Sequence, residues 1–223
     1  MTYLLIILGI IFIPLVAQFY INFTYKKYLK QNSSQNISGF EVARKILDSN
    51  GLNDIHIVST SGMLTDHYDP SRNVIRLSND IFDKNTVSSV SVAAHECGHA
   101  LQKKDGYFLM KIRTFLVPIV NFSNKIAYIV LILGFLLEYA GLIEIAIILM
   151  SSGVLFQLVT LPVEINASRR AKKELIKLNL ISSEEHDKVK NVLTAAAFTY
   201  VAGLLSSLLE LLRLVLIINN RRD

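Results

Sequence analysis

Two histidines and a carboxylate stand at metal-site spacing in the segment His95-Glu96-Cys97-Gly98-His99. An α-helix turns about 100° per residue, so His95 and His99 would lie about 40° apart on one face, where two imidazoles can bind one ion. Zinc accepts imidazole and carboxylate ligands, and a catalytic zinc has three protein ligands and a water. The pair therefore predicts a zinc site that needs one further ligand. Glu96 would point past the ion, where it can accept a proton from the water as general base.

The helix that would carry these residues has an apolar side opposite the histidines. A His-Glu-x-x-His match also arises by chance on surface helices, but here apolar residues recur at 3-4-3-4 spacing. They are Val87, Val90, Ala94, Cys97 and Leu101. Asn85 or Thr86 can cap the start of this helix, and the segment 103–106 ends it. We interpret Cys97, the only cysteine, as a packed core residue and not a ligand.

The composition is that of a membrane protein. The chain has 223 residues, of which 52% are hydrophobic, and it lacks Trp. Its net charge is +5, and the basic residues cluster beside apolar segments, which favours a membrane surface as partner. The sequence shows no pattern of basic and aromatic residues typical of nucleic-acid binding. We predict a mainly α integral membrane protein with about four transmembrane helices and a small α+β, zincin-like catalytic portion that carries the HExxH helix.

Five segments are predicted along the chain. They are a first transmembrane helix at 1–25, a cytoplasmic catalytic portion with a β-hairpin and the HExxH helix at 26–107, an interfacial helix and a transmembrane hairpin at 108–164, a cytoplasmic helical segment at 165–190, and a fourth transmembrane helix with a tail at 191–223. The first apolar run has no preceding Lys or Arg, so we interpret it as an uncleaved anchor with the N-terminus outside.

The catalytic portion is expected to hold a helix at 39–48 and a small antiparallel ribbon. Residues 55–58 and 73–77 are typical of strands, and the polar segment 66–72 between them supplies turn residues. An exposed edge of this ribbon could bind an extended peptide by strand addition. A purely structural hairpin fits the same pattern.

The charges predict which side of the membrane the metal helix faces. The tip of the hairpin carries Glu138 and Glu144, whereas basic residues flank the apolar segments on the other side. These are Lys26, Lys27, Lys30, Lys103, Lys104, Lys111, Arg113, Arg169, Arg170, Lys172, Lys173, Lys188 and Lys190. The positive-inside rule then places the metal helix in the cytoplasm, although Arg221 and Arg222 oppose this orientation.

Several residues are candidates for the third ligand. His56, His67 and His186 are the remaining histidines, and Asp105 would need a sharp break of the helix before it. Glu164 is better placed, since it is the first charged residue after the hairpin, at the cytoplasmic membrane boundary. Alternatively, Glu164 is an acid at the membrane interface beside a basic cluster, without a role as ligand.

The segments 64–70, 90–102 and 156–171 resemble those of the YugP-like neutral zinc metallopeptidases, a bacterial membrane family akin to the gluzincin-type HtpX and prenyl-protein peptidases. The resemblance covers nearly the whole chain. It implies that His95, His99 and Glu164 bind one Zn²⁺ per chain and that Glu96 is the catalytic base. HtpX-like relatives have Asp four residues after the ligand Glu, where this chain has Ser168. A hydroxyl can orient a ligand but lends it no charge.

We therefore expect a zinc-dependent endopeptidase in the cell membrane, multi-pass, with its catalytic residues facing the cytoplasm. Its partners would be a polypeptide substrate, which can itself be a membrane protein, and the lipid bilayer, with no nucleic acid. His67 or Tyr68 could stabilise the oxyanion. Two alternatives remain, a zinc hydrolase of a non-peptide amide or ester and a non-catalytic membrane scaffold.

Overall fold

Four helices of this protein are long and apolar enough to cross a membrane. The computed structural model describes residues 1–222, apart from the side chains of residues 2, 221 and 222. The charges of Arg221 and Arg222, which oppose the predicted orientation, therefore lie outside the described side chains. The four helices are α1 (Thr2–Leu29), α5 (Phe108–Leu136), α6 (Ala140–Lys177) and α7 (His186–Arg222). The prediction of a mainly α, multi-pass membrane protein is confirmed.

One compact unit consists of membrane-spanning helix segments. It comprises Met1–Gln18, Phe108–Pro162 and Thr199–Asp223. Leu131 on α5, Ile143 on α6 and Leu214 on α7 pack together in its core. Large apolar side chains such as Phe122 and Ile148 remain 68% and 71% exposed, as suits a surface that faces lipid.

The helix α5 is continuous where two segments were predicted. An interfacial helix followed by a transmembrane hairpin was expected at 108–164, but the structure joins the interfacial helix and the first crossing into one helix of 29 residues that contains Pro118. This helix is long enough to cross a bilayer. A tight turn with Glu138 at φ 51° then leads into α6.

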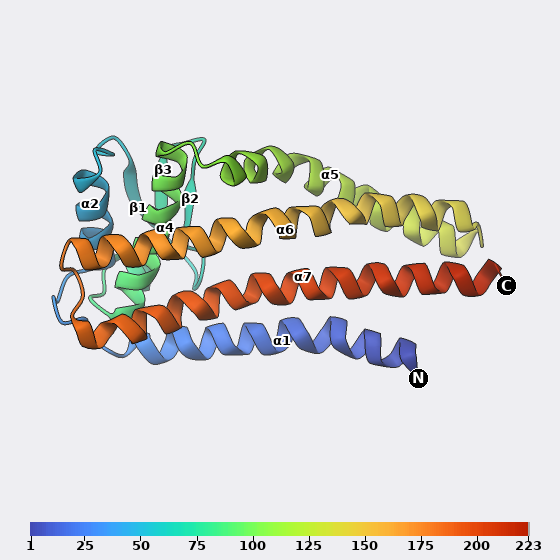
Figure 1. Cartoon of the computed structure of the whole chain (residues 1–223), viewed down its shortest axis with the longest axis horizontal. Coiled ribbons are helices and arrows are strands. Elements are labelled where there is room, and N and C mark those ends of the chain that lie inside the picture. Colours follow the sequence, from blue (N-terminus) through green and yellow to red (C-terminus); the bar gives the residue numbers. More distant parts are fainter. Residues whose placement is uncertain (223) are drawn as a thin grey trace. The chain divides into compact units, whose positions relative to one another are not determined.

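The second compact unit is a small α+β domain. It comprises Phe19–Tyr107 and Val163–Phe198. Besides segments of α1, α6 and α7, it contains α2 (Gly39–Ser49), α3 (Asn79–Phe82), α4 (Val87–Lys104), a short 3₁₀ turn (Ser183–Glu185) and the strands β1 (His56–Thr60), β2 (His67–Asp69) and β3 (Val74–Ser78). Figure 1 shows α2 and α4 beside the sheet, with α6 and α7 entering the same unit.

The sheet corrects the predicted antiparallel ribbon. The strand order is β1-β3-β2, and β1 pairs with β3 in parallel, with Ile57 opposite Ile75. The short strand β2 lies on the other side of β3 and pairs with it antiparallel, with Tyr68 opposite Ile75. The predicted antiparallel pairing of 55–58 with 73–77 is therefore wrong, because β2 takes the hairpin position beside β3.

The helix α4 lies in the middle of the hydrophobic core of this unit. Its predicted apolar stripe is buried against α2, the sheet and α6, and Val90, Ala94 and Cys97 are fully enclosed. The Thr86 side chain accepts a hydrogen bond from the backbone N–H of Ser89 and so caps the helix, as predicted. This burial sets which face of α4 is turned toward α6.

Candidate metal centre

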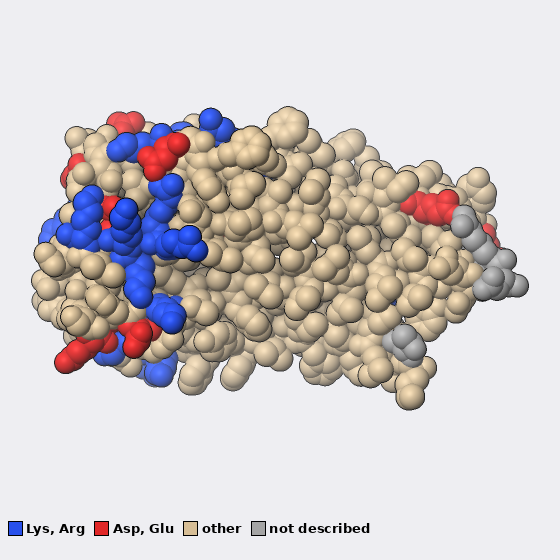
Figure 2. Space-filling view, in the orientation of Figure 1, with Lys and Arg blue, Asp and Glu red and all other residues tan. Residues whose placement is uncertain are grey.

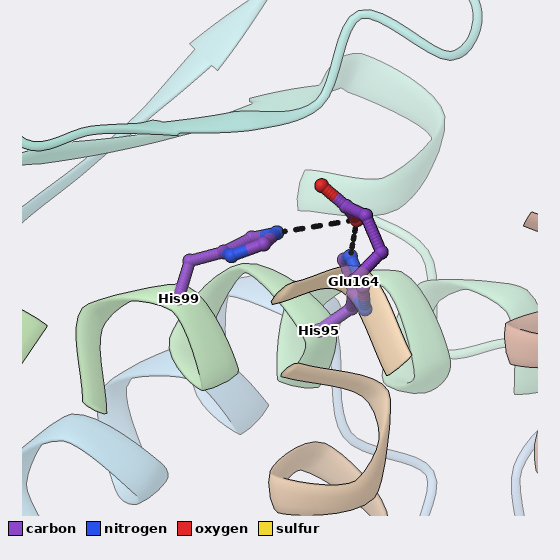
Figure 3. A group of neighbouring side chains, drawn as sticks. All are labelled: His95, His99 and Glu164. Carbon is purple, nitrogen blue, oxygen red and sulfur yellow. Dashed lines mark hydrogen bonds and ion pairs between the residues drawn. The ribbon is translucent and has the colours of Figure 1, made fainter. Parts of the chain in front are cut away.

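Three side chains from two helices meet at one point in the α+β unit. His95 and His99 extend from α4 and Glu164 extends from α6 toward them, as Figure 3 shows. The Oε2 atom of Glu164 lies 3.1 Å from Nε2 of His95 and 3.5 Å from Nε2 of His99. The side chain of Glu164 is 2% exposed and those of the histidines 12% and 7%. A buried carboxylate thus faces two imidazole nitrogens.

The close approach of α4 to α6 depends on Gly98. A β carbon built at this position would overlap the backbone carbonyl oxygen of Ala167 and lie 3.0 Å from its carbonyl carbon. Only a residue without a β carbon lets the two backbones come this near. Since Gly98 stands one residue before His99 and Ala167 three after Glu164, this contact sets the distance across the site.

Gln102 orients His99. Its amide nitrogen donates to the carbonyl of Val163 at 2.8 Å and to Oδ1 of Asn166 at 3.0 Å, so its oxygen faces Nδ1 of His99 at 3.0 Å. An amide oxygen can only accept, and Nδ1 of His99 must therefore carry the proton. The lone pair of His99 then lies on Nε2, the atom that faces Glu164. Gln102 is fully buried, and it also ties α4 to α6.

Ser168 has the corresponding place beside His95. Its hydroxyl oxygen lies 3.2 Å from Nδ1 of His95, while Nε2 of the same ring faces Glu164. The hydroxyl of Ser168 thus contacts the ring. It holds the imidazole in position without adding a negative charge.

Glu96, which follows His95 on α4, is also buried. It is 6% exposed, and its carboxylate makes no hydrogen bond or ion pair with another residue in the part of the chain that the structure describes. Burial raises the pKa of Asp66, and the negative charge of Glu96 raises it further. Asp66 accepts hydrogen bonds from the backbone and hydroxyl of Ser78 and is thereby held in place.

The donor set fits a zinc ion. One donor atom from each of His95, His99 and Glu164 can be chosen so that all lie within 4.8 Å of one another. Two ligands at about 2.1 Å from a tetrahedral zinc are separated by about 3.4 Å. The observed separations of 3.1 and 3.5 Å lie on either side of that value.

The other predicted candidates lie elsewhere. Asp105 forms an ion pair with Arg170 at the end of α4. His56, His67 and His186 do not belong to the group formed by the two α4 histidines and Glu164 among the described residues.

Neither candidate for oxyanion stabilisation contacts the three residues by a hydrogen bond in the described chain. Tyr68 packs in the core and its hydroxyl donates to Oδ1 of Asn73, while burial raises its pKa to about 12. The Nδ1 atom of His67 lies 2.8 Å from the carbonyl oxygen of Thr65. Gln102, in contrast, was not predicted, although its place three residues after His99 on one helix puts it within reach of that ring.

Comparison with known proteins agrees with these features. A family model described as "Putative neutral zinc metallopeptidase" matches residues 3–219. A relative from Bacillus subtilis (strain 168), named "Putative membrane protease YugP", is 47% identical over 207 residues, which make up 93% of this chain and 92% of the relative. No solved structure matches the chain at a significant level. The family match spans both helices that carry the three residues.

Proposed function

The chain belongs to the neutral zinc metallopeptidase family, and from that premise we propose that it is a membrane-embedded, zinc-dependent endopeptidase with its catalytic residues at the cytoplasmic face. The observation that carries the proposal is the convergence of His95, His99 and Glu164 within 4.8 Å. The family implies Zn²⁺ as cofactor, and this donor set suits it.

The residues have distinct roles in the proposed reaction. His95, His99 and Glu164 would hold the ion. Gln102 keeps His99 in the tautomer that leaves Nε2 free to bind it, and Ser168 contacts Nδ1 of His95. Zinc, when bound, polarises the scissile carbonyl and acidifies the attacking water. Glu96 accepts the proton of that water and passes it to the leaving amine. Its buried carboxylate is available for this work, since no described cation neutralises it.

The charge distribution supports the proposed orientation. Figure 2 shows Lys and Arg side chains gathered over the α+β unit, whereas the face of the helical unit seen in this view shows few charged side chains. Basic residues beside membrane spans are retained on the cytoplasmic side. We therefore orient the α+β unit, with the metal ligands, toward the cytoplasm.

The decisive experiment replaces the base and keeps the ligands. We expect Glu96→Gln to retain zinc at the wild-type level and to lose cleavage of casein and unfolded peptides by about 10²-fold or more. Glu184→Gln, an exposed acid ahead of α7, is the matched control and should cleave normally.

Three outcomes separate the alternatives. Proteolysis by Glu96→Gln with zinc still bound would refute the assigned mechanism. Zinc-loaded wild-type protein that cleaves no polypeptide would point to hydrolysis of a non-peptide amide or ester. If the purified protein contained no zinc, the non-catalytic membrane scaffold would be the alternative that fits.

A further inference from the structure

A groove with a basic rim lies between α6 and α7 in the α+β unit. Its volume is about 760 Å³, within the range of small-molecule sites. The α6 residues that line it are three or four positions apart, from Ile165 through Arg169 and Lys172 to Ile176, so they form one continuous face of that helix. Lys190 and Leu193 line it from α7.

The rim carries cations that have no partner among the residues that the structure describes. Among the described residues, Arg169, Lys172, Lys173 and Lys190 make no hydrogen bond or ion pair. The adjacent Arg170, in contrast, donates to Asn166 and pairs with Asp105. The described lining residues include no Asp or Glu. Four like charges therefore line a groove whose described lining holds no acid, and this arrangement favours an anion.

The floor of the groove is apolar and continues toward the membrane spans. Ile165, Leu193 and Ala197 line this end of the groove, and Ile165 is 42% exposed. Ile165 comes two residues after α6 leaves the helical unit, and Ala197 comes two residues before α7 enters it. On each helix the cations stand farther from the spans than Ile165, Leu193 and Ala197, and Ile176 lies beyond them on α6. An occupant would therefore have an apolar part toward the bilayer and an anionic part away from it.

We propose that this groove binds an anionic phospholipid of the surrounding membrane, with the phosphate among the four cations and the start of an acyl chain on the apolar floor. Charge complementarity selects the headgroup, because a zwitterionic lipid would bring an ammonium group among cations with no acid to receive it. Figure 2 shows Lys and Arg gathered over the part of the α+β unit where α6 and α7 lie.

The bound lipid would lie next to the metal centre. Ser168 lines the groove, and the same hydroxyl lies 3.2 Å from Nδ1 of His95. Ile165 directly follows Glu164 in the chain. The lipid would neutralise the mutual repulsion of the rim and so stabilise the pair of helix segments that presents Glu164 and Ser168. Binding does not depend on proteolysis and can be tested without it.

The test uses zinc-loaded full-length protein in detergent micelles. Phosphatidylglycerol, phosphatidylcholine or inorganic phosphate is added in separate titrations, and thermal unfolding is followed with a thiol-reactive fluorogenic dye, since Cys97 is the only cysteine and is buried. The groove variant is Lys172→Gln/Lys190→Gln. The control, Lys45→Gln/Lys188→Gln, removes the same charge from residues that do not line the groove, and Lys188 stands two positions from Lys190 on α7.

Phosphatidylglycerol should raise the Tm of wild type and control by about 5 °C with saturation, and the groove variant should lose most of this rise. Phosphatidylcholine and phosphate should have little effect. If phosphatidylglycerol raised the Tm of the groove variant as much as that of the control, the lipid would not bind in this groove. If phosphatidylcholine raised the wild-type Tm as much as phosphatidylglycerol, the groove would not select an anionic headgroup. A rise with phosphate alone would assign the site to free anions instead. Should the double variant not fold, the single variants Lys190→Gln and Lys188→Gln are compared instead. Native mass spectrometry then counts the phosphatidylglycerol bound to each, and only Lys190→Gln should bind less.

Discussion

The backbone of Gly98 on α4 rests against the carbonyl group of Ala167 on α6, without room for a β carbon between them. This contact places the ligand-bearing faces of the two helices at a separation that lets Glu164 meet both histidines. The site thus depends on a residue that contributes no side chain.

Gly98→Ala should therefore force α4 and α6 apart. We expect a loss of about 1–3 kcal/mol in stability and a drop in zinc affinity of at least tenfold, measured by thermal unfolding and chelator competition. Gly153→Ala is the control, because a β carbon there meets only the Asn124 side chain, no nearer than 3.6 Å, and should leave both quantities nearly unchanged. Wild-type zinc affinity in Gly98→Ala would contradict this role of the contact.

Gln102→Leu should weaken the site through His99. The change removes the acceptor of the Nδ1 proton and the donor to the Val163 carbonyl, leaving buried polar groups without partners. The expected cost is about 1–3 kcal/mol of stability, with a 10- to 100-fold loss of zinc affinity. Chelator competition measures the second. If zinc affinity were unchanged while stability fell, Gln102 would serve only to join the helices.

Substitutions at Ser168 should change zinc affinity in opposite directions. Ser168→Ala removes the hydroxyl from Nδ1 of His95 and is expected to weaken zinc binding several-fold. Ser168→Asp would place a carboxylate at the same ring and make it a stronger ligand, so zinc affinity should rise. Both are measured by chelator competition without added anionic lipid. A fall in affinity with Asp equal to that with Ala would mean that the carboxylate does not reach the ring.

Cys97 should be inert in the folded protein. Its side chain is fully buried, and burial raises the pKa of its thiol above the ordinary value. A maleimide at pH 8 should label it only after denaturation, which intact mass spectrometry can count. Rapid labelling of the folded chain would show that α4 is more open than its packing indicates.

The same thiol gives stability a defined dependence on pH. Because the folded-state pKa is raised, the unfolded chain ionises first as pH rises through its ordinary value of 9.0, and stability falls above that pH and not below it. Between pH 8 and pH 10 the wild type should lose about 1 kcal/mol more than Cys97→Ala, in which other titrating groups are unchanged. Circular dichroism melts of both proteins at the two pH values test this difference.

The proposed orientation is tested at the turn between α5 and α6. Alkaline phosphatase inserted after Glu138 should be active, since this turn would lie outside, whereas a fluorescent protein inserted there should not mature. Insertion in the exposed segment after Ser61 should give the reverse result, because the α+β unit would lie in the cytoplasm. Activity of the phosphatase at both positions would contradict the orientation.

The sequence by itself determined the features that depend on neighbours within a few turns. The apolar runs predicted four membrane-spanning helices, and the 3-4 spacing around Cys97 predicted the buried side of α4. The cap at Thr86 was also predicted, since a capping side chain bonds to backbone a few residues away. In each case the interacting groups are close along the chain.

Strand pairing was beyond such reasoning. Residues 56–60 and 74–78 show their tendency to form strands locally, but the direction of their pairing depends on which strand lies beside which. The three residues of β2 were too few to be recognised as a strand, and β2 is the one that pairs antiparallel with β3.

Only the tertiary structure decided how the candidate centre is put together. Glu164 stands 69 positions from His95, and no local pattern states that their side chains meet at 3.1 Å. The contacts by which Gln102 and Gly98 join α4 to α6 could not be predicted, because their partners, Val163 and Ala167, lie on another helix. The histidine pair was visible because one helix holds both ligands, whereas the third side chain, its supports and the close approach of α4 to α6 exist only after long-range packing has closed the core.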